Sequence, residues 1–334
     1  MVSIGIVGLP NAGKSSLFKA LTGEAVEIAK YPFTTIKPHH GIVKVPDETL
    51  EALGKITPGN KVIPAGIEFV DIAGLIKGAH KGEGLGNEFL SHIRKVDAIL
   101  EVVRAFEDST VPHPEGSIDP ERDKKIIREE LIQADLSQIE RAFEKYQSET
   151  KSGRTENARI FEVLKKTKEL LKNNHIIRER LNTEEANLLK EFNFLTSKPL
   201  LVILNNPDLP LNLLAETAEL EESEAKEIIK NYGFDENPLQ NLIRKAFELL
   251  DLITFYTVKP PETRAWNVKK GTLLPEAGGA IHSDFQEKFI RAEVILAETL
   301  LAIGDWHKAK SQGKIRTEGR EYIVQDKDVI EFKI

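Results

Sequence analysis

The first residues of the chain pass from an apolar run through a glycine-rich segment into a helical pattern. Val2–Val7 is apolar and ends at Gly8, and apolar residues at helical spacing begin after Ser15. This order predicts a strand, a glycine loop and a helix. Further short apolar runs predict buried strands at Gly41–Val45, Ile67–Ile72, Ala98–Val103 and Leu200–Leu204. Helical patterns lie between most of them, so we expect an α/β domain with a parallel sheet.

A long helical pattern interrupts this sheet from about residue 122 to 194, where Glu, Lys, Arg and Leu dominate. Its apolar residues are three or four positions apart: Ile132, Leu136, Ile139, Phe143 and Tyr146. After a break near Ser152–Gly153, others follow in matching phase: Leu181, Leu188, Phe192 and Leu195. Such spacing is typical of helices that pack along one another. We interpret this segment as a helical hairpin inserted into the α/β domain.

The pattern changes again after Leu252. Short β-type runs with turn residues between them occur at Ile253–Val258, Ala265–Val268, Tyr322–Val324 and Val329–Phe332. A helical pattern lies near Ser283–Leu301. We expect a separate small α+β domain around this helix.

Composition excludes several classes of protein. The chain has 334 residues, no cysteine and a formal charge of −7, so disulfides, thiolate metal sites and a cysteine nucleophile are excluded. No apolar run approaches a membrane span and no basic region precedes Val2, so we expect a cytoplasmic protein without membrane contact. Any RNA contact must be local.

One local basic cluster is a candidate for RNA phosphates. It consists of Lys308, Lys310, Lys314, Arg316 and Arg320, flanked by Trp306 and Tyr322. The alternative, which we favour for the cluster, is a solvated loop.

Gly8–Ser15 matches the P-loop pattern G-x-x-x-x-G-K-[ST] at every fixed position and lies between the predicted strand and helix. Glycine permits close approach of the backbone, so successive N–H groups face phosphates. Lys14 would contact the β and γ oxygens, and the Ser15 hydroxyl would bind Mg²⁺. We therefore expect Mg-nucleotide binding, with these contacting residues: Asn11, Ala12, Gly13, Lys14, Ser15 and Ser16.

The motif Asp71-Ile-Ala-Gly74 ends another predicted strand. At this distance after a P-loop, Asp71 is a Mg²⁺ candidate and the Gly74 N–H a γ-phosphate contact. Thr34 and Thr35 lie in the loop between the two motifs, and we expect Thr35 to complete the Mg²⁺ shell. The two loops are our candidate switches.

Motifs are distributed along most of the chain, at Gly8–Ser15, Tyr31–Thr35, Asp71–Ala79, Lys81–Asn87, Arg264–Trp266, His282–Phe285, Phe289–Glu293 and Val324–Asp326. Together they resemble the YchF family of Obg-like ATPases. The resemblance covers nearly the whole chain. It implies a Ras-like P-loop domain with an inserted coiled coil, followed by a TGS domain of ubiquitin-like fold. It also implies hydrolysis of ATP in preference to GTP, and association with the rRNA and proteins of the ribosome.

Domain boundaries follow from this organisation. We expect residues 1–121 and 196–251 to form the P-loop domain, 122–195 the helical hairpin and 252–334 the TGS domain.

Three residues are interpreted through the resemblance. Leu75 stands where Ras-like enzymes place a glutamine that orients water, and a leucine has no group for that task. His113 matches the histidine proposed to replace that glutamine, and a merely solvated loop histidine is the alternative. Asn11 resembles an asparagine that holds a monovalent cation, K⁺ being the candidate. Its alternative role is to stabilise the turn.

The sequence departs from the family after Asn205. Family members carry Asn-x-x-Glu, then a helix and another strand. This chain has Asn205-Asn-Pro-Asp208 followed at once by Leu209–Ala215, and a parallel crossover of the usual length does not fit. Asn205 and Asp208 are the candidates for the base, with weak selectivity expected.

Three functions remain open on the sequence. The first is a slow nucleoside triphosphatase switch that docks on the ribosome. A P-loop phosphotransferase and a nucleotide-bound scaffold without turnover are the alternatives. The pairing of Asp71–Gly74 with Thr35 favours the switch, because small-molecule kinases rarely need two loops that sense the γ-phosphate.

Overall fold

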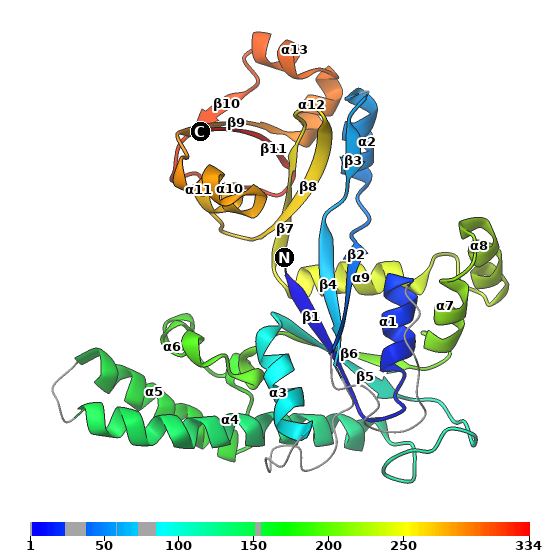
Figure 1. Ribbon diagram of the computed structural model, residues 1–334, viewed down its shortest axis with the longest axis vertical. Coiled ribbons are helices and arrows are strands. Elements are labelled where there is room, and N and C mark those ends of the chain that lie inside the picture. Colours follow the sequence, from blue (N-terminus) through cyan, green and yellow to red (C-terminus); the bar gives the residue numbers. More distant parts are fainter. Residues whose placement is uncertain (1, 24–37, 58, 73–84, 151–154) are drawn as a thin grey trace. The chain divides into compact units, whose positions relative to one another are not determined.

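The computed structural model describes residues 2–23, 38–57, 59–72, 85–150 and 155–334 (Figure 1). The chain forms two compact units. One consists of residues 2–41 and 68–239, and the other of residues 42–67 and 240–334. Residues 42–67 and 240–251, which the sequence analysis assigned to the P-loop domain, are therefore part of the C-terminal unit. Among the described residues, no helix is both long and apolar enough to cross a bilayer.

The first unit is built on a five-stranded sheet of order β2-β4-β1-β5-β6, of which the end of β2 and the start of β4 belong to the second unit. Its strands are β1 (Ser3–Val7), β2 (His39–Lys44), β4 (Gly66–Asp71), β5 (Ala98–Arg104) and β6 (Leu200–Asn205). The pairs β1–β4, β1–β5 and β5–β6 are parallel. Every residue of β1 and β5 is buried, as expected for parallel strands covered on both faces. This confirms the predicted α/β class.

The order of the strands explains where a ligand would bind. The chain fills one side of β1 with β4 and β2 before it places β5 and β6 on the other side. Ligands in open α/β sheets bind beyond the carboxyl ends of the strands at such a switch point. Four features lie at these carboxyl ends. They are the loop after β1, Asp71 at the end of β4, Arg104 at the end of β5 and Asn205 at the end of β6.

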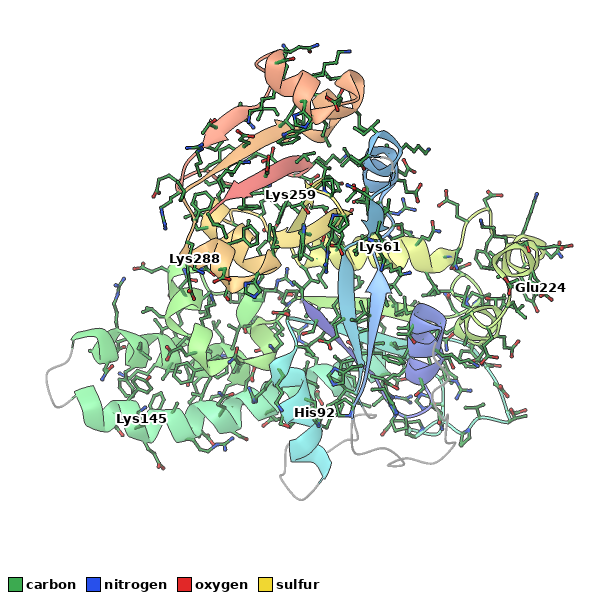
Figure 2. All side chains as sticks on the ribbon, turned by 45° about the horizontal axis from the view of Figure 1, so that its top comes forward. Lys61, His92, Lys145, Glu224, Lys259 and Lys288 are labelled. Carbon is green, nitrogen blue, oxygen red and sulfur yellow. The ribbon has the colours of Figure 1, made fainter. Side chains whose placement is uncertain are left out.

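Helices cover the sheet of this unit and extend from it. They are α1 (Lys14–Thr22), α3 (Leu85–Lys95), α4 (Pro120–Thr150), α5 (Thr155–Lys172), α6 (Thr183–Leu188), α7 (Leu211–Thr217) and α8 (Glu222–Asn231). Three short 3₁₀ helices, η2 to η4, occupy Ile177–Glu179, Lys190–Phe192 and Leu195–Ser197. Figure 2 shows Lys145 of α4 and Glu224 of α8 among the exposed charged side chains.

The predicted hairpin is present, but its returning arm is not where the pattern placed it. The second helix is α5, which ends before Asn174, a residue in the left-handed conformation with φ 59°. The expected continuation between residues 181 and 195 instead consists of short helices, one started by an Asn182–Glu185 capping box. The apolar side chains of this stretch, including Leu181, Leu188 and Phe192, still pack against the hairpin core. The helical spacing of these residues therefore indicated which side chains are buried, and did not indicate one continuous helix.

The second unit contains a six-stranded sheet of order β10-β9-β11-β7-β8-β3. Its strands are β3 (Lys61–Ile63), β7 (Leu252–Thr257), β8 (Glu262–Lys269), β9 (Arg291–Leu296), β10 (Arg316–Glu318) and β11 (Asp328–Lys333). Its helices are α2 (Glu48–Ile56), α9 (Pro238–Leu249), α10 (Leu274–Ile281), α11 (Ser283–Glu287), α12 (Ala297–Ile303) and α13 (Trp306–Ser311). The β7–β8 hairpin and the parallel pairing of β11 with β7 confirm the predicted α+β domain.

Two sequence predictions in this unit were wrong. The helix expected at 283–301 is interrupted by β9, because Val294 and Ile295 are β-branched and pair with β11 in the core of the sheet. The run Tyr322–Val324 is not a strand, and Ile323 forms only an isolated bridge with Leu273. No element was predicted for the segment that forms α2 and β3, and this segment joins the sheet through Lys61 opposite Glu262.

Candidate nucleotide-binding site

The loop after β1 requires glycine at two positions for steric reasons. A Cβ on Gly8 would lie 2.4 Å from the Val102 carbonyl oxygen of β5. A Cβ on Gly13 would lie 2.4 Å from Asn205 Nδ2, and Gly13 has a φ of 104° that disfavours other residues. The loop therefore lies against the carboxyl ends of β5 and β6, with its backbone directed into helix α1.

Lys14, the first residue of α1, is buried in this loop. Its Nζ donates a hydrogen bond to the Leu9 carbonyl oxygen at 2.9 Å, and only 8% of the residue is exposed. Burial lowers the pKa of Lys14 to about 8, although the charge of Asp71 opposes the shift. The fold thus keeps a cation with little solvation at the P-loop, which suits it to bind a polyanion.

Ser15 and Asp71 lie together as the motif spacing predicted. The Ser15 hydroxyl donates to Asp71 Oδ2 at 3.1 Å. Burial raises the pKa of Asp71, while the Lys14 charge and the Ser15 hydrogen bond lower it. A hydroxyl beside a carboxylate is a set of hard oxygen donors that fits Mg²⁺. The other predicted phosphate and metal contacts, Thr35 and Gly74, lie outside the described residues, as does Leu75.

The Asn205 side chain links the P-loop to the start of helix α7. Its Nδ2 donates to the Ala12 carbonyl oxygen at 3.0 Å, and its Oδ1 accepts from the Leu211 N–H at 3.3 Å. A second link joins the Ser16 hydroxyl to Asn212 Oδ1 at 2.9 Å. Helix α7 is therefore bonded to both the P-loop and α1.

Asp208, the predicted base contact, is exposed in a tight turn. Asn206 Oδ1 accepts hydrogen bonds from the Asp208 and Leu209 N–H groups at 3.1 and 3.0 Å. Helix α7 begins three residues after Asp208 at Leu211, directly after Pro210. Within the described residues the sheet ends at β6, so no further strand supports this turn.

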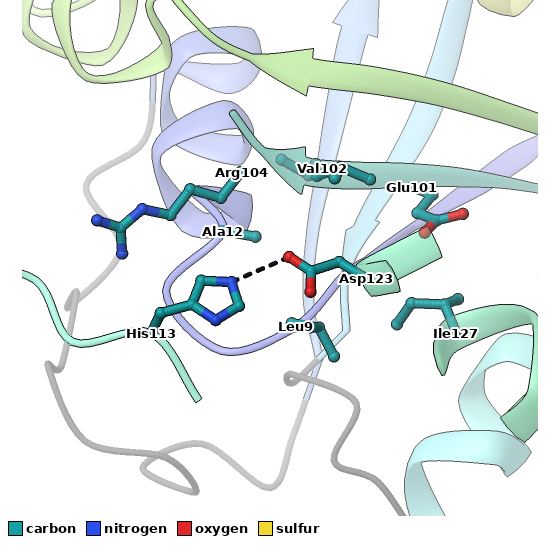
Figure 3. Close-up of a pocket in the computed structure, with 9 residues that line it drawn as sticks. Leu9, Ala12, Glu101, Val102, Arg104, His113, Asp123 and Ile127 are labelled. Atoms are coloured by element: carbon teal, nitrogen blue, oxygen red, sulfur yellow. Dashed lines mark hydrogen bonds and ion pairs between the residues drawn. The ribbon is translucent and has the colours of Figure 1, made fainter. Parts of the chain in front are cut away.

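His113 is buried beside the P-loop (Figure 3). Its Nε2 lies 2.9 Å from Asp123 Oδ2, and the two side chains are only 5% and 4% exposed. Its Nδ1 accepts the Glu115 N–H at 3.2 Å, which assigns the ring proton to Nε2. The Asn11 Nδ2 donates to the Pro112 carbonyl oxygen at 3.0 Å, so the P-loop holds the loop that carries the histidine.

Two residues of β5 that sequence reasoning missed also line this region. Arg104 is 2% exposed and donates to the carbonyl oxygens of Phe106, Asp108 and Val111, which fixes the start of the His113 loop. Burial raises the pKa of Glu101 to about 8, so this side chain is mostly protonated at neutral pH. The sequence could have identified both residues, because Glu101 and Arg104 are the charged residues of an otherwise apolar strand.

In the second unit, much of the basic cluster is engaged within the unit. Lys310 pairs with Glu293 at 2.6 Å, and Arg316 stacks on Tyr322 and lies 3.9 Å from Asp328. Arg320 donates to the Phe289 carbonyl oxygen at 2.6 Å. These bonds engage three of the five cations within the unit, and Lys308, Lys310 and Arg316 lie on α13 and β10 rather than in a loop.

Comparisons with known proteins agree with this geometry. Residues 3–166 match a family described as "50S ribosome-binding GTPase", and residues 252–334 match the YchF-GTPase_C family, described as a protein of unknown function. The chain is 43% identical to "Ribosome-binding ATPase YchF" of Bacillus subtilis and 40% identical to that of Escherichia coli O157:H7. These alignments cover 99% and 98% of both chains. The structure of the Schizosaccharomyces pombe YchF GTPase superposes with a TM-score of 0.82 at 32% identity, covering 99% of this chain and 97% of that one.

Proposed function

This chain belongs to the YchF family, and we propose that it hydrolyses ATP with Mg²⁺ as a cytoplasmic, ribosome-associated switch. The observation that carries the proposal is the arrangement of Lys14, Ser15 and Asp71 at the switch point of the sheet. A buried cation on a glycine loop beside a hydroxyl and a carboxylate suits a magnesium-bound triphosphate.

In this proposal the chain's own residues divide the task. The P-loop N–H groups and Lys14 bind the β and γ phosphates and stabilise charge on them as the γ-phosphorus bond to the leaving oxygen breaks. Water supplies the new oxygen of the released phosphate. Ser15 and Asp71 would hold Mg²⁺, which when bound neutralises phosphate charge. Thr35 and Gly74 remain the candidate γ-phosphate contacts from the sequence.

We assign His113 the task of positioning the attacking water, since Leu75 has no group for it. Asn11 is our candidate ligand for K⁺ through its amide oxygen, because its amide nitrogen already binds the Pro112 carbonyl. The same bond places Asn11 next to the loop of His113. A cation there would lie between the P-loop and the water-positioning group.

The decisive experiment is phosphate release from ATP with and without 70S ribosomes. We expect slow release that ribosomes accelerate, and a higher rate in K⁺ than in Na⁺ buffer. Release only in the presence of an acceptor molecule would support the phosphotransferase instead. Nucleotide binding without release in any condition would support the scaffold. Equal rates in the two salts would remove the K⁺ assignment.

We predict weak discrimination between bases. Asn205 is 4% exposed and its amide is used on the P-loop and α7, while Asp208 is exposed in a turn without a supporting strand. Polar contacts that are not made supply no discrimination. ATP and GTP affinities should therefore agree within about tenfold, a difference of about 1.4 kcal/mol.

Calorimetric titration of both nucleotides under one Mg²⁺ and salt condition measures this ratio. Asp208→Asn is the matched variant, because it removes the carboxylate that would select guanine. We expect it to leave the ratio unchanged. A hundredfold preference, or a shift toward ATP in Asp208→Asn, would show that the turn contacts the base.

A further inference from the structure

His113 is fully occupied in this structure, which is unusual for a group that must orient water. One ring nitrogen accepts the Glu115 N–H at 3.2 Å and the other donates to Asp123 at 2.9 Å. Neither nitrogen has a free position for water while both bonds exist, and the imidazole is 95% buried. In a catalytic dyad the second nitrogen faces the reaction, whereas here it faces its own loop.

Asp123 belongs to the hairpin, one residue after Arg122 in the first turn of α4. The Arg122 guanidinium donates to Asp123 Oδ1 at 2.9 and 3.1 Å, which leaves Oδ2 for the histidine. A carboxylate held in this way forms a strong, directed hydrogen bond with an N–H donor. The orientation of His113 therefore depends on the start of the 31-residue helix α4.

The other side of the His113 loop is fixed to the nucleotide domain. Arg104 of β5 binds three carbonyl groups between Phe106 and Val111, and Asn11 of the P-loop binds Pro112. The histidine thus lies at the join between an anchored loop and the hairpin. Moving α4 by more than about 0.6 Å along the bond would lengthen the 2.9 Å contact beyond about 3.5 Å, where it ceases to be a hydrogen bond.

We propose that Asp123 is a positioning residue that holds His113 in a resting state, and that displacement of the hairpin helix α4 releases the histidine for hydrolysis. The proposal rests on the proposed function and adds its regulation. According to the proposal, a bound ribosome accelerates turnover by moving the hairpin. Packed helices transmit such shifts because they move as rigid elements between discrete arrangements.

The test compares steady-state ATP hydrolysis by the full chain, with and without ribosomes, in Asp123→Ala and Asp123→Asn. Without ribosomes, Asp123→Ala should raise kcat by about tenfold or more at unchanged KM, with the roughly 10²–10⁴-fold contribution of water-positioning groups as the upper limit. Ribosomes should then add little. Asp123→Asn should give a smaller rise, because its amide oxygen still accepts the imidazole N–H. It preserves the shape of the buried side chain, so it decides the matter if Asp123→Ala does not fold.

Glu121→Ala is the matched control. It removes an exposed carboxylate from the same first turn of α4, which pairs with Lys124 and does not touch His113. It should hydrolyse like the wild type. The double variant Asp123→Ala/His113→Ala should fall to the rate of His113→Ala alone, because the gain passes through the histidine.

Two results would overturn the proposal. A folded Asp123→Ala with lower kcat would mean that Asp123 supports the histidine during turnover, and a rise that persists without His113 would mean another route. Failure of the proposed function has a different signature. Ribosomes would then leave the wild-type rate unchanged, or His113→Ala would hydrolyse normally.

Discussion

Lys14→Met is expected to abolish hydrolysis and, at the same time, to stabilise the nucleotide-free protein. Without the ammonium group the β and γ oxygens lose their direct cationic contact, so kcat/KM should fall by about 10²–10³-fold or more. A buried Lys whose pKa is lowered from 10.5 to about 8 costs the folded state ~3 kcal/mol at neutral pH. Methionine fills the space of the alkyl chain without that cost. The variant also loses the hydrogen bond to the Leu9 carbonyl oxygen, which costs it about 1 kcal/mol. We therefore expect the free energy of unfolding to rise by roughly 2 kcal/mol in total.

The pH dependence of this gain identifies its cause. Because the pKa of Lys14 is lower in the folded state, the wild type carries the full penalty below pH 8 and loses it as pH rises toward 10.5. Methionine has no ionisable group, so the stability of the variant does not depend on pH through this position. Thermal unfolding without nucleotide should therefore show the largest gain in stability for the variant below pH 8, and no gain near pH 10.5.

Lys19→Met is the control for both readouts. Lys19 lies on the same helix, but it is paired with Glu219 near the surface, so its replacement should change neither activity nor stability much. Wild-type turnover in Lys14→Met would remove the P-loop assignment. A loss of stability in that variant, with activity abolished, would show that the Leu9 bond outweighs the buried charge.

The parts of this fold that sequence analysis placed correctly depend on local patterns. The P-loop needs a strand, two glycines and a helix start within a few residues, and the sequence of Val2–Ser15 contains all of these signals. Apolar runs likewise located β4, β5 and β6. Every residue of β5 is buried, as expected for a parallel strand covered on both faces, whereas β6 at the edge of the sheet is only partly buried. The proximity of Ser15 to Asp71 also followed, because the loop that leads to Ser15 and the residue Asp71 both lie at the carboxyl ends of the neighbouring strands β1 and β4.

The errors arose where distant contacts decide between local alternatives. Arg291–Leu296 follows a helical stretch, and only its pairing with β11 makes it a strand. The apolar residues between 181 and 195 keep a helical phase although Asn174 and Asn182 divide the backbone into short pieces. Neither pairing partners nor tertiary burial can be read from such windows.

The candidate site was limited in the same way. His113 was chosen by resemblance, and no sequence pattern showed that it is bonded to Asp123, ten residues later on another element. Asn205 was expected at the base, whereas its amide supports Ala12 and α7. Both are side-chain hydrogen bonds across the fold, and these depend on rotamers rather than on spacing.

His113→Ala should lower the ribosome-stimulated rate by about 10²–10⁴-fold, the usual contribution of a group that positions or activates water. The effect should fall on kcat, because the imidazole contributes nothing to the P-loop contacts that bind the triphosphate, and KM for ATP should stay near the wild-type value. Without ribosomes the decrease should be smaller, since both ring nitrogens are already engaged by Glu115 and Asp123 in the resting protein.

Single-turnover phosphate release with ribosomes in excess measures this step without interference from product release. His175→Ala is the matched control, because His175 lies after the hairpin helix α5 and contacts Arg180 rather than the P-loop. It should behave like the wild type. If His113→Ala releases phosphate normally on the ribosome, the water must be oriented by another group, and the buried contact with Asp123 would then be a structural link between the hairpin and the sheet.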